Sequence, residues 1–332
     1  MVGLVSLHFG NRLTLLIDHR VACMGSAYRN AGLFTVLSVL WGTAFVAIKA
    51  GLADLPPVLF ASLRYDLAGV FLLAYAAAAT DQLLPRSRAD WAEVIVGAVL
   101  LIAAYNGLLF IGQQGVTSAV AAILIATAPV LTTGFSRALL PQEGLAPLGV
   151  LGIALGFAGV GLVALPGESL TIDSLAAPGL IVLAAVSVAL GSVLLERVNS
   201  AMPTESAIAW SFLAGAGLLH LASMATPTES LAEATASPDA IAALLYLAVF
   251  ASVIGYVIYF RLLDRLGPVE INLVSYAVPV SAAAAGWAVR NEPIDAPAVA
   301  GFLVILTGFV LIKRRALADR IALVRQYRQT EA

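Results

Sequence analysis

The sequence predicts an all-α integral membrane protein whose ten transmembrane helices form two inverted five-helix repeats. Three observations carry this prediction: the composition, ten apolar stretches long enough to span a bilayer, and motifs that recur about 149 residues apart. Of the 332 residues, 61% are hydrophobic and 11% are charged, and the mean hydropathy is +0.95. Soluble domains are about 45–50% apolar and about 25% charged, so this composition excludes a soluble fold.

Each apolar stretch is close to the roughly 20 residues that a helix needs to cross the hydrocarbon core. The stretches are continuous and rich in leucine and alanine, whereas the strands of a membrane barrel alternate over about ten residues. We therefore expect helices. In chain order they span residues 31–51, 57–79, 92–112, 115–136, 145–165, 177–195, 206–225, 240–260, 269–289 and 296–312.

The chain divides into five predicted segments. They are a cytoplasmic N-terminal extension (1–29), a first five-helix repeat (30–165), an outer linker (166–176), a second five-helix repeat (177–313) and a basic cytoplasmic tail (314–332). Met24, just before the first helix, is an alternative to Met1 as the start of translation. The tail either fixes the topology alone or forms an amphipathic helix on anionic lipid.

Three pairs of motifs occur in the same order in both halves of the chain. The pairs are Pro57 and Leu67-Ala68-Gly69 with Pro203 and Leu213-Ala214-Gly215, Pro129-Val130 with Pro279-Val280, and Glu143, Gly152 and Gly159 with Glu292, Gly301 and Gly308. Because each repeat has an odd number of helices, the second repeat must enter the bilayer inverted. Many secondary transporters are built in this way, with a site near the midplane between the repeats. Transport is therefore the leading functional prediction.

Basic residues mark the cytoplasmic side of a membrane protein. With the N-terminus in the cytoplasm, fifteen of the eighteen basic residues fall in inner segments and only Arg290 falls in an outer one, while Lys49 and Arg64 lie within or at the ends of helices. The sequence therefore predicts a multi-pass protein of the plasma membrane, of the bacterial inner-membrane type, with both termini in the cytoplasm.

The first predicted helix carries Trp41-Gly42-Thr43-Ala44-Phe45 followed by Lys49. This run resembles the opening W-G-x-x-F…K pattern of the drug/metabolite transporter superfamily, EamA type. Further matches are Pro57, Arg64, Pro129, Glu143, Pro279 and Glu292. The resemblance covers residues 31–313. It implies a plasma-membrane carrier of small metabolites, often an exporter of amino acids, with a central cavity between the repeats.

Polar and aromatic residues at helical spacing mark the faces expected to line a substrate pathway, because amides and hydroxyls at mid-depth need a partner or water. Helix packing is the alternative for each residue. The expected lining residues are Trp41, Phe45, Tyr105, Asn106, Phe110, Tyr256, Tyr259, Asn272, Ser275 and Tyr276. Pro129 and Pro279 interrupt the fourth and ninth predicted helices, and they either let these helices bend during transport or fix a packing kink.

Three charged residues are candidates for binding or coupling. Asp66 is predicted near mid-depth, where it either hydrogen bonds to neighbouring helices or carries a coupling proton. Nothing in the sequence pairs it with a second titratable group, which favours a facilitator over a proton-driven pump. Lys49 and Arg64 are predicted near the outer ends of their helices, where they either extend to the interface or contact an anionic group of the substrate.

Other chemistry has few residues to support it. The histidines are His8, His19 and His220 and the single cysteine is Cys23, so we expect no metal site and no cofactor. The sequence has no phosphate-binding loop for an ATP-driven pump and no serine nucleophile motif for a membrane enzyme. The expected partners are a small-molecule substrate and the lipid bilayer, without nucleic acid.

The predicted function is secondary transport by alternating access, as an exporter or facilitator. Aromatic faces and amide groups favour hydrophobic or aromatic amino acids as the substrate. Lipophilic cations, exported by proton antiport, are the alternative because aromatic rings also attract cations. A membrane-embedded enzyme is the remote alternative.

Overall fold

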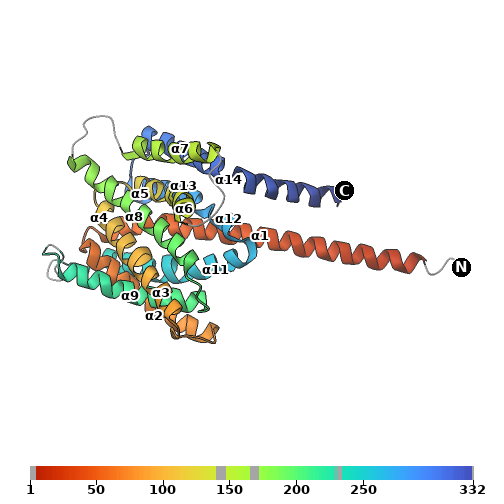
Figure 1. Ribbon diagram of the computed structural model, residues 1–332, viewed down its shortest axis with the longest axis horizontal. Coiled ribbons are helices and arrows are strands. Elements are labelled where there is room, and N and C mark those ends of the chain that lie inside the picture. The colour runs from red at the N-terminus through yellow and green to blue at the C-terminus, as the bar shows by residue number, and fades with distance from the viewer. Residues whose placement is uncertain (1–4, 140–146, 165–171, 228, 230–233, 331–332) are drawn as a thin grey trace.

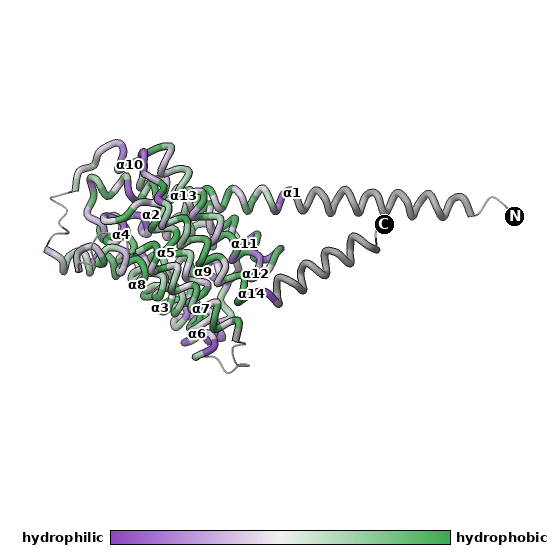
Figure 2. Tube along the Cα trace, turned by 90° about the horizontal axis from the view of Figure 1, so that it is seen from above, coloured by the Kyte–Doolittle hydropathy of each residue, from purple (hydrophilic) through white to green (hydrophobic). Residues whose placement is uncertain are grey.

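The computed structural model of the chain describes residues 5–139, 147–164, 172–227, 229 and 234–330, and within these residues all regular secondary structure is helical. The helices pack side by side into a bundle (Figure 1). Hydrophobic residues dominate the helices of this bundle (Figure 2). The predicted all-α membrane fold is confirmed.

Helical spans follow one another along the described chain, and each of the ten predicted ranges falls on one of them. They are α1 (Val5–Gly51), α2 (Pro57–Ala79), α3, η1 and α4 (Arg88–Val96, Gly97–Ala104 and Tyr105–Gln113), α5 and α6 (Ser118–Ile125 and Ala128–Leu139), α7 (Pro147–Ala164), α8 (Ile172–Arg197), α9 (Thr204–Met224), α10, η2 and α11 (Pro238–Leu245, Tyr246–Ile254 and Gly255–Leu266), α12 and α13 (Pro268–Ile271 and Val274–Arg290) and α14 (Ala296–Thr330), where η marks a π-helix. Within the described residues, seven spans are long and apolar enough to cross a membrane, and the apolar parts of α7 and α14 are shorter.

The first and last helices are longer than predicted. The first was expected to begin near residue 31 and the last to end near 312, but α1 begins at Val5 and α14 continues to Thr330. Residues 5–30 and 313–330 contain no proline, so nothing in them interrupts helical hydrogen bonding. Both extensions leave the bundle on the same side (Figure 1), so the two ends of the chain lie on one side of it.

The two halves of the chain also resemble each other in local backbone structure. Ser87 caps α3, where its Oγ accepts a hydrogen bond from the Asp90 amide at 3.0 Å, and Ser237 caps α10 by accepting from the Ala240 amide at 3.1 Å. These two serines are 150 positions apart, and each begins a span whose middle third is a π-helix. Local π-helical segments are rare in proteins. Their recurrence in both halves therefore supports the two-repeat architecture.

The glycines of the repeated motif meet across the contact between α7 and α14. A methyl group added to Gly159 would lie 2.7 Å from the carbonyl oxygen of Gly301, and one added to Gly301 would lie 2.8 Å from that of Gly159. Gly152 and Gly308 form the same reciprocal contact, at 2.6 Å and 2.5 Å. Moving back along α7 from Gly159 to Gly152 corresponds to moving forward along α14 from Gly301 to Gly308, so the two helices run antiparallel. Small residues let their backbones approach closely, and equivalent helices of the two repeats are thereby packed against each other.

Other helix pairs follow the same two-fold relation. The second helices of the two repeats, α2 and α9, pack together, as do α1 with α13 and α6 with α8. The pairs α1–α13 and α6–α8 are equivalent, because each joins the first helix of one repeat to the fourth helix of the other. Equivalent helices of the two repeats therefore occupy equivalent places in the bundle.

Candidate functional site

A cavity of about 240 Å³ lies at the centre of the bundle and is lined by both repeats. Its wall is made by Trp41, Ala44, Phe45, Ile48, Arg64, Tyr65, Leu101, Tyr105, Asn106, Leu109, Ala122, Ile125, Ala126, Ala128, Val188, Ala251, Tyr256, Ser275 and Val278. Six of the residues expected to line a pathway are among them: Trp41, Phe45, Tyr105, Asn106, Tyr256 and Ser275. The structure thus brings together residues that are far apart in the sequence.

Four expected lining residues lie elsewhere. Phe110 is fully buried and packs edge-on against Phe60, with ring centroids 5.4 Å apart. Tyr276 is buried against Phe309, at 4.4 Å. Asn272 is exposed in the turn between α12 and α13. Tyr259 lies behind the wall, with its ring centroid 5.7 Å from that of Trp41.

Arg64 lies inside the bundle, on the cavity wall. The expectation that it lies near the outer end of α2 and extends to the interface is wrong, because only 8% of the residue is exposed. Its Nε donates to Ser252 Oγ at 3.2 Å, and its guanidinium carbon is 4.9 Å from the centroid of the Tyr65 ring. Among the residues that the structure describes, no carboxylate forms an ion pair with Arg64. The cavity therefore contains a cation whose described partners are a hydroxyl and an aromatic face.

The polar groups around Arg64 are held by hydrogen bonds to the two π-helices. Tyr65 donates its hydroxyl to Asn106 Oδ1 at 3.0 Å, and Asn106 Nδ2 donates to the Ile102 carbonyl of η1 at 2.9 Å. Trp41 of the first repeat contacts the second repeat, where its Nε1 donates to the Ala251 carbonyl of η2 at 3.1 Å. At the end of η2 the Gly255 amide donates to the carbonyls of Phe250 and Ser252, and the Ala251 carbonyl between them accepts from Trp41. The wall is thus preorganised.

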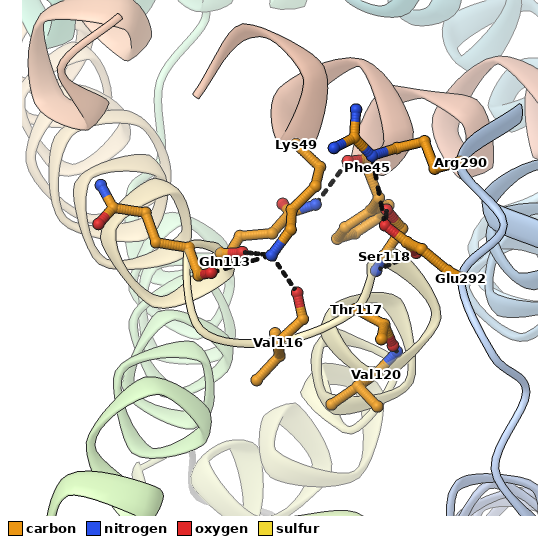
Figure 3. Close-up of polar contacts among 10 residues, drawn as sticks. Phe45, Lys49, Gln113, Val116, Thr117, Ser118, Val120, Arg290 and Glu292 are labelled. Atoms are coloured by element: carbon orange, nitrogen blue, oxygen red, sulfur yellow. Dashed lines mark hydrogen bonds and ion pairs between the residues drawn. The ribbon is translucent and has the colours of Figure 1, made fainter. Parts of the chain in front are cut away.

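Lys49 hydrogen bonds to backbone at the end of the bundle that lies away from the two chain termini, which we call the outer end. Its Nζ donates to the carbonyls of Gln113, Gln114 and Val116 at 3.0, 2.9 and 2.8 Å (Figure 3). These carbonyls end α4, where a cation also interacts favourably with the helix dipole. Gln113 in turn donates to the Phe45 carbonyl of α1, at 2.5 Å. The ammonium group thereby ties α1 to the end of α4.

Glu292 also forms hydrogen bonds at the outer end. Its carboxylate accepts from the Ser118 amide at 2.8 Å and from the Ser118 hydroxyl at 3.1 Å, and it lies 3.6 Å from Arg290 Nε (Figure 3). A carboxylate at the first turn of α5 satisfies an amide that has no partner within its helix. We call Lys49, Gln113, Ser118 and Glu292 the outer latch. Glu143, the repeat equivalent of Glu292, lies outside the described residues.

The outer latch separates two cavities. On α1, Phe45 and Ile48 face the central cavity, whereas Lys49 and Leu52 line a second cavity of about 510 Å³ at the outer end of the bundle. This outer cavity is more polar and also contains Arg290. Along α1, Lys49 of the latch therefore lies at the boundary between the two cavities.

Asp66 is not on the wall of the central cavity. Its Oδ2 lies 2.6 Å from Nε2 of His220 on α9, and Nδ1 of His220 lies 3.2 Å from the hydroxyl of Ser62. The side chains of Asp66 and His220 are 43% and 31% exposed, so the pair lies at the periphery of the contact between α2 and α9. The sequence-based expectation that Asp66 has no second titratable partner is wrong.

A signal for this pair is present in the sequence. The repeated Leu-Ala-Gly runs predict that α2 and α9 are equivalent helices, and Gly69 indeed packs on Leu213. Antiparallel packing at this register places Asp66 opposite residue 216, within about one helical turn of His220. The match between the runs could therefore have predicted the partner.

The inverted repeats and the cavity between them define the class of protein, a membrane transporter. The EamA-like transporter family matches residues 30–165 and 176–314, one stretch for each repeat, and the chain belongs to this family. The resemblance predicted from Trp41 to Lys49 is therefore confirmed. The chain is 28% identical over 299 residues to "Uncharacterized transporter YvbV" of Bacillus subtilis (strain 168), covering 89% of this chain and 95% of that protein.

Two further relatives agree. "Uncharacterized inner membrane transporter YedA" of Escherichia coli (strain K12) is 30% identical over 265 residues, which cover 80% of this chain and 84% of that protein. A solved structure described as "Crystal structure of protein" superposes with a TM-score of 0.62 at 22% identity and covers 89% of this chain and 99% of its own. This likeness supports the fold. The family and the relatives carry the names of transporters rather than enzymes.

Proposed function

We propose that the protein is a secondary transporter that moves hydrophobic or aromatic amino acids across the plasma membrane by alternating access, as an exporter or facilitator. The observation that carries this proposal is Arg64, a buried guanidinium on the wall of a mostly aromatic and apolar cavity. A buried cation at membrane depth is costly and marks a site of function by default. A substrate carboxylate would pair with it.

The size and lining of the cavity support a small solute with an apolar side chain. Its volume of about 240 Å³ is below the roughly 300–1,000 Å³ of sites for drug-sized ligands. Trp41 and Tyr256 present rings 5.9 Å apart, and Phe212 packs behind Tyr65 and Tyr256 at 4.8 and 5.3 Å. Such rings contribute apolar contact, and the hydroxyls of Tyr65 and Tyr256 add hydrogen-bonding capacity.

Lipophilic cations are the weaker candidate. Among the described residues of the cavity wall there is no aspartate or glutamate to neutralise a cation, and Arg64 would repel one. Orientation also belongs to the proposal: both chain ends lie on one side of the bundle, and the basic residues near them indicate that this side is cytoplasmic (Figure 1).

Counterflow into proteoliposomes that contain the full chain tests the proposal. L-phenylalanine and L-leucine should exchange, whereas tetraphenylphosphonium should not. Arg64→Gln should weaken apparent affinity for L-phenylalanine roughly 10- to 150-fold, since hydrogen bonds to charged groups contribute about 1.5–3 kcal/mol. Arg261→Gln, which changes an exposed arginine of α11, is the matched control. Exchange of the cation alone, or an Arg64→Gln variant with unchanged affinity, would overturn the assignment.

A further inference from the structure

The two repeated prolines each remove a hydrogen bond from a residue on the cavity wall. Pro129 and Pro279 have no N–H, so the carbonyls four residues earlier, those of Ile125 and Ser275, lose their α-helical donors. Ile125 and Ser275 both line the central cavity. The helices that carry them, α5 and α13, pack against each other. The inverted repeat thus brings the two residues with these carbonyls to one cavity.

The break between α5 and α6 adds a third carbonyl. The Val130 amide donates to the Thr127 carbonyl at 2.9 Å rather than to that of Ala126, which would be its α-helical acceptor. Ala126 is also on the cavity wall. Nearby threonine hydroxyls donate to the carbonyls of Leu124, Ala128 and Pro129 at 2.6, 2.8 and 2.9 Å. These hydroxyls satisfy the neighbours of Ile125 and Ala126 and leave the carbonyls of the wall for another donor.

We propose that the carbonyls of Ile125, Ala126 and Ser275 form a subsite for the ammonium group of the substrate. This inference rests on the proposed function and adds the recognition of the second charge of an amino acid. An ammonium has three donors and no acceptor, so it requires acceptors on the protein. The described wall contains no carboxylate, and backbone carbonyls at broken helices are the groups that bind cations in other inverted-repeat transporters.

Together with Arg64, this subsite makes the cavity selective for zwitterions. The guanidinium binds the carboxylate and the carbonyls bind the ammonium, while the aromatic wall contacts the side chain. A ligand that lacks the ammonium leaves the carbonyls unpaired in a desolvated site, which lowers affinity. The wild-type protein is therefore expected to bind L-phenylalanine at least tenfold more tightly than 3-phenylpropionate, which differs by the amino group.

Proline-to-alanine substitutions test the subsite directly. Pro129→Ala and Pro279→Ala each restore an N–H, which occupies the carbonyl of Ile125 or Ser275. Each should weaken binding of L-phenylalanine about tenfold and leave binding of 3-phenylpropionate unchanged. Pro178→Ala is the matched control, because Pro178, like Pro279, lies inside a helix, α8, but it lies outside the central cavity wall. Pro178→Ala should change the binding of neither ligand.

The outcomes separate the subsite from the proposed function. Equal loss of both ligands in Pro129→Ala and Pro279→Ala would mean that the prolines act through helix bending, and the subsite would be wrong. The wild-type comparison tests the subsite without any variant, and equal affinity for the two ligands would also refute it. If neither ligand binds the wild-type protein, the proposed function is wrong and the subsite with it.

Discussion

Substituting alanine for Gly159 adds one methyl group to the close contact between α7 and α14. The new Cβ would lie 2.7 Å from the Gly301 carbonyl oxygen and 3.0 Å from the Ile305 amide nitrogen of α14. Both atoms belong to the backbone, so neither can rotate aside. The helices α7 and α14 must therefore separate to accommodate the methyl group.

The size of the effect follows from these distances. Ordinary van der Waals contact begins at 3.4 Å, so the helices must move apart by about 0.7 Å, which is 3.4 minus 2.7. Overpacking of this kind costs about 1–3 kcal/mol. Replacing a glycine within a helix also returns up to about 1 kcal/mol of helix propensity. This gain partly hides the packing cost in any single variant.

Gly161→Ala removes that ambiguity. Gly161 lies two residues further along α7, and a methyl group there meets nothing within 4 Å. Both variants receive the same gain in propensity, so the difference between them isolates the packing cost. We expect Gly159→Ala to be less stable than Gly161→Ala by about 1–3 kcal/mol when unfolding of the purified proteins is measured in detergent. Equal stability of the two variants would refute the close approach of α7 and α14.

Three further predictions concern the outer latch, the orientation and the energy source. Lys49→Met removes the three hydrogen bonds that the ammonium group donates. A cysteine introduced at Ala44 on the cavity wall should then react at least tenfold faster with an impermeant thiol reagent added outside. An unchanged rate would contradict the latch. In a Cys23→Ser background, Ala236→Cys should label from outside intact cells and Asp81→Cys should not, and the reverse pattern would invert the proposed topology. Proton antiport through the hydrogen-bonded pair Asp66 and His220 predicts that wild-type vesicles concentrate substrate under an imposed pH gradient, and that Asp66→Asn and His220→Gln lose this accumulation but keep exchange. Wild-type vesicles that only equilibrate substrate would show the protein to be a facilitator.

The fold could be predicted because the composition, the lengths of the apolar stretches and the repeated motifs all point to it. Membrane helices must satisfy their own backbone, so length and hydropathy determine where they lie. The glycine spacing of Gly152, Gly159, Gly301 and Gly308 then predicted the repeat, and the structure shows why the spacing recurs: these residues face each other. The helical tail to Thr330 is one of the two alternatives that the sequence offers, whereas the start of α1 at Val5 has no signal because its polar first segment does not mark where a helix begins.

The site could be predicted only in part, because helical periodicity gives a face of a helix without saying which neighbour covers it. Tyr276 and Ser275 are adjacent in the sequence, yet Ser275 faces the cavity and Tyr276 packs against Phe309. The position of Arg64 along α2 alone predicts a place near the outer end, because it counts residues from the start of the helix and takes no account of helix packing. Since equivalent helices cross near the centre, a residue only about two turns into α2 already faces the cavity.

Equivalent motifs adopt different conformations in the two repeats, and this asymmetry is what alternating access requires. Pro129 and Pro279 are equivalent positions, 150 residues apart. In the first repeat the helix is interrupted at residues 126–127, which correspond to residues 276–277 of the second repeat. The second repeat is instead interrupted at residues 272–273, one helical turn earlier. Because the repeats are inverted, exchanging the two conformations would turn a molecule closed at its outer end into one closed at its inner end. The outer latch is formed in this structure, while Arg197, at the inner end of α8 near the repeat equivalent of Lys49, is exposed. Exchange must therefore break the bonds of Lys49, and the reactivity of a cysteine at Ala44 measures that step.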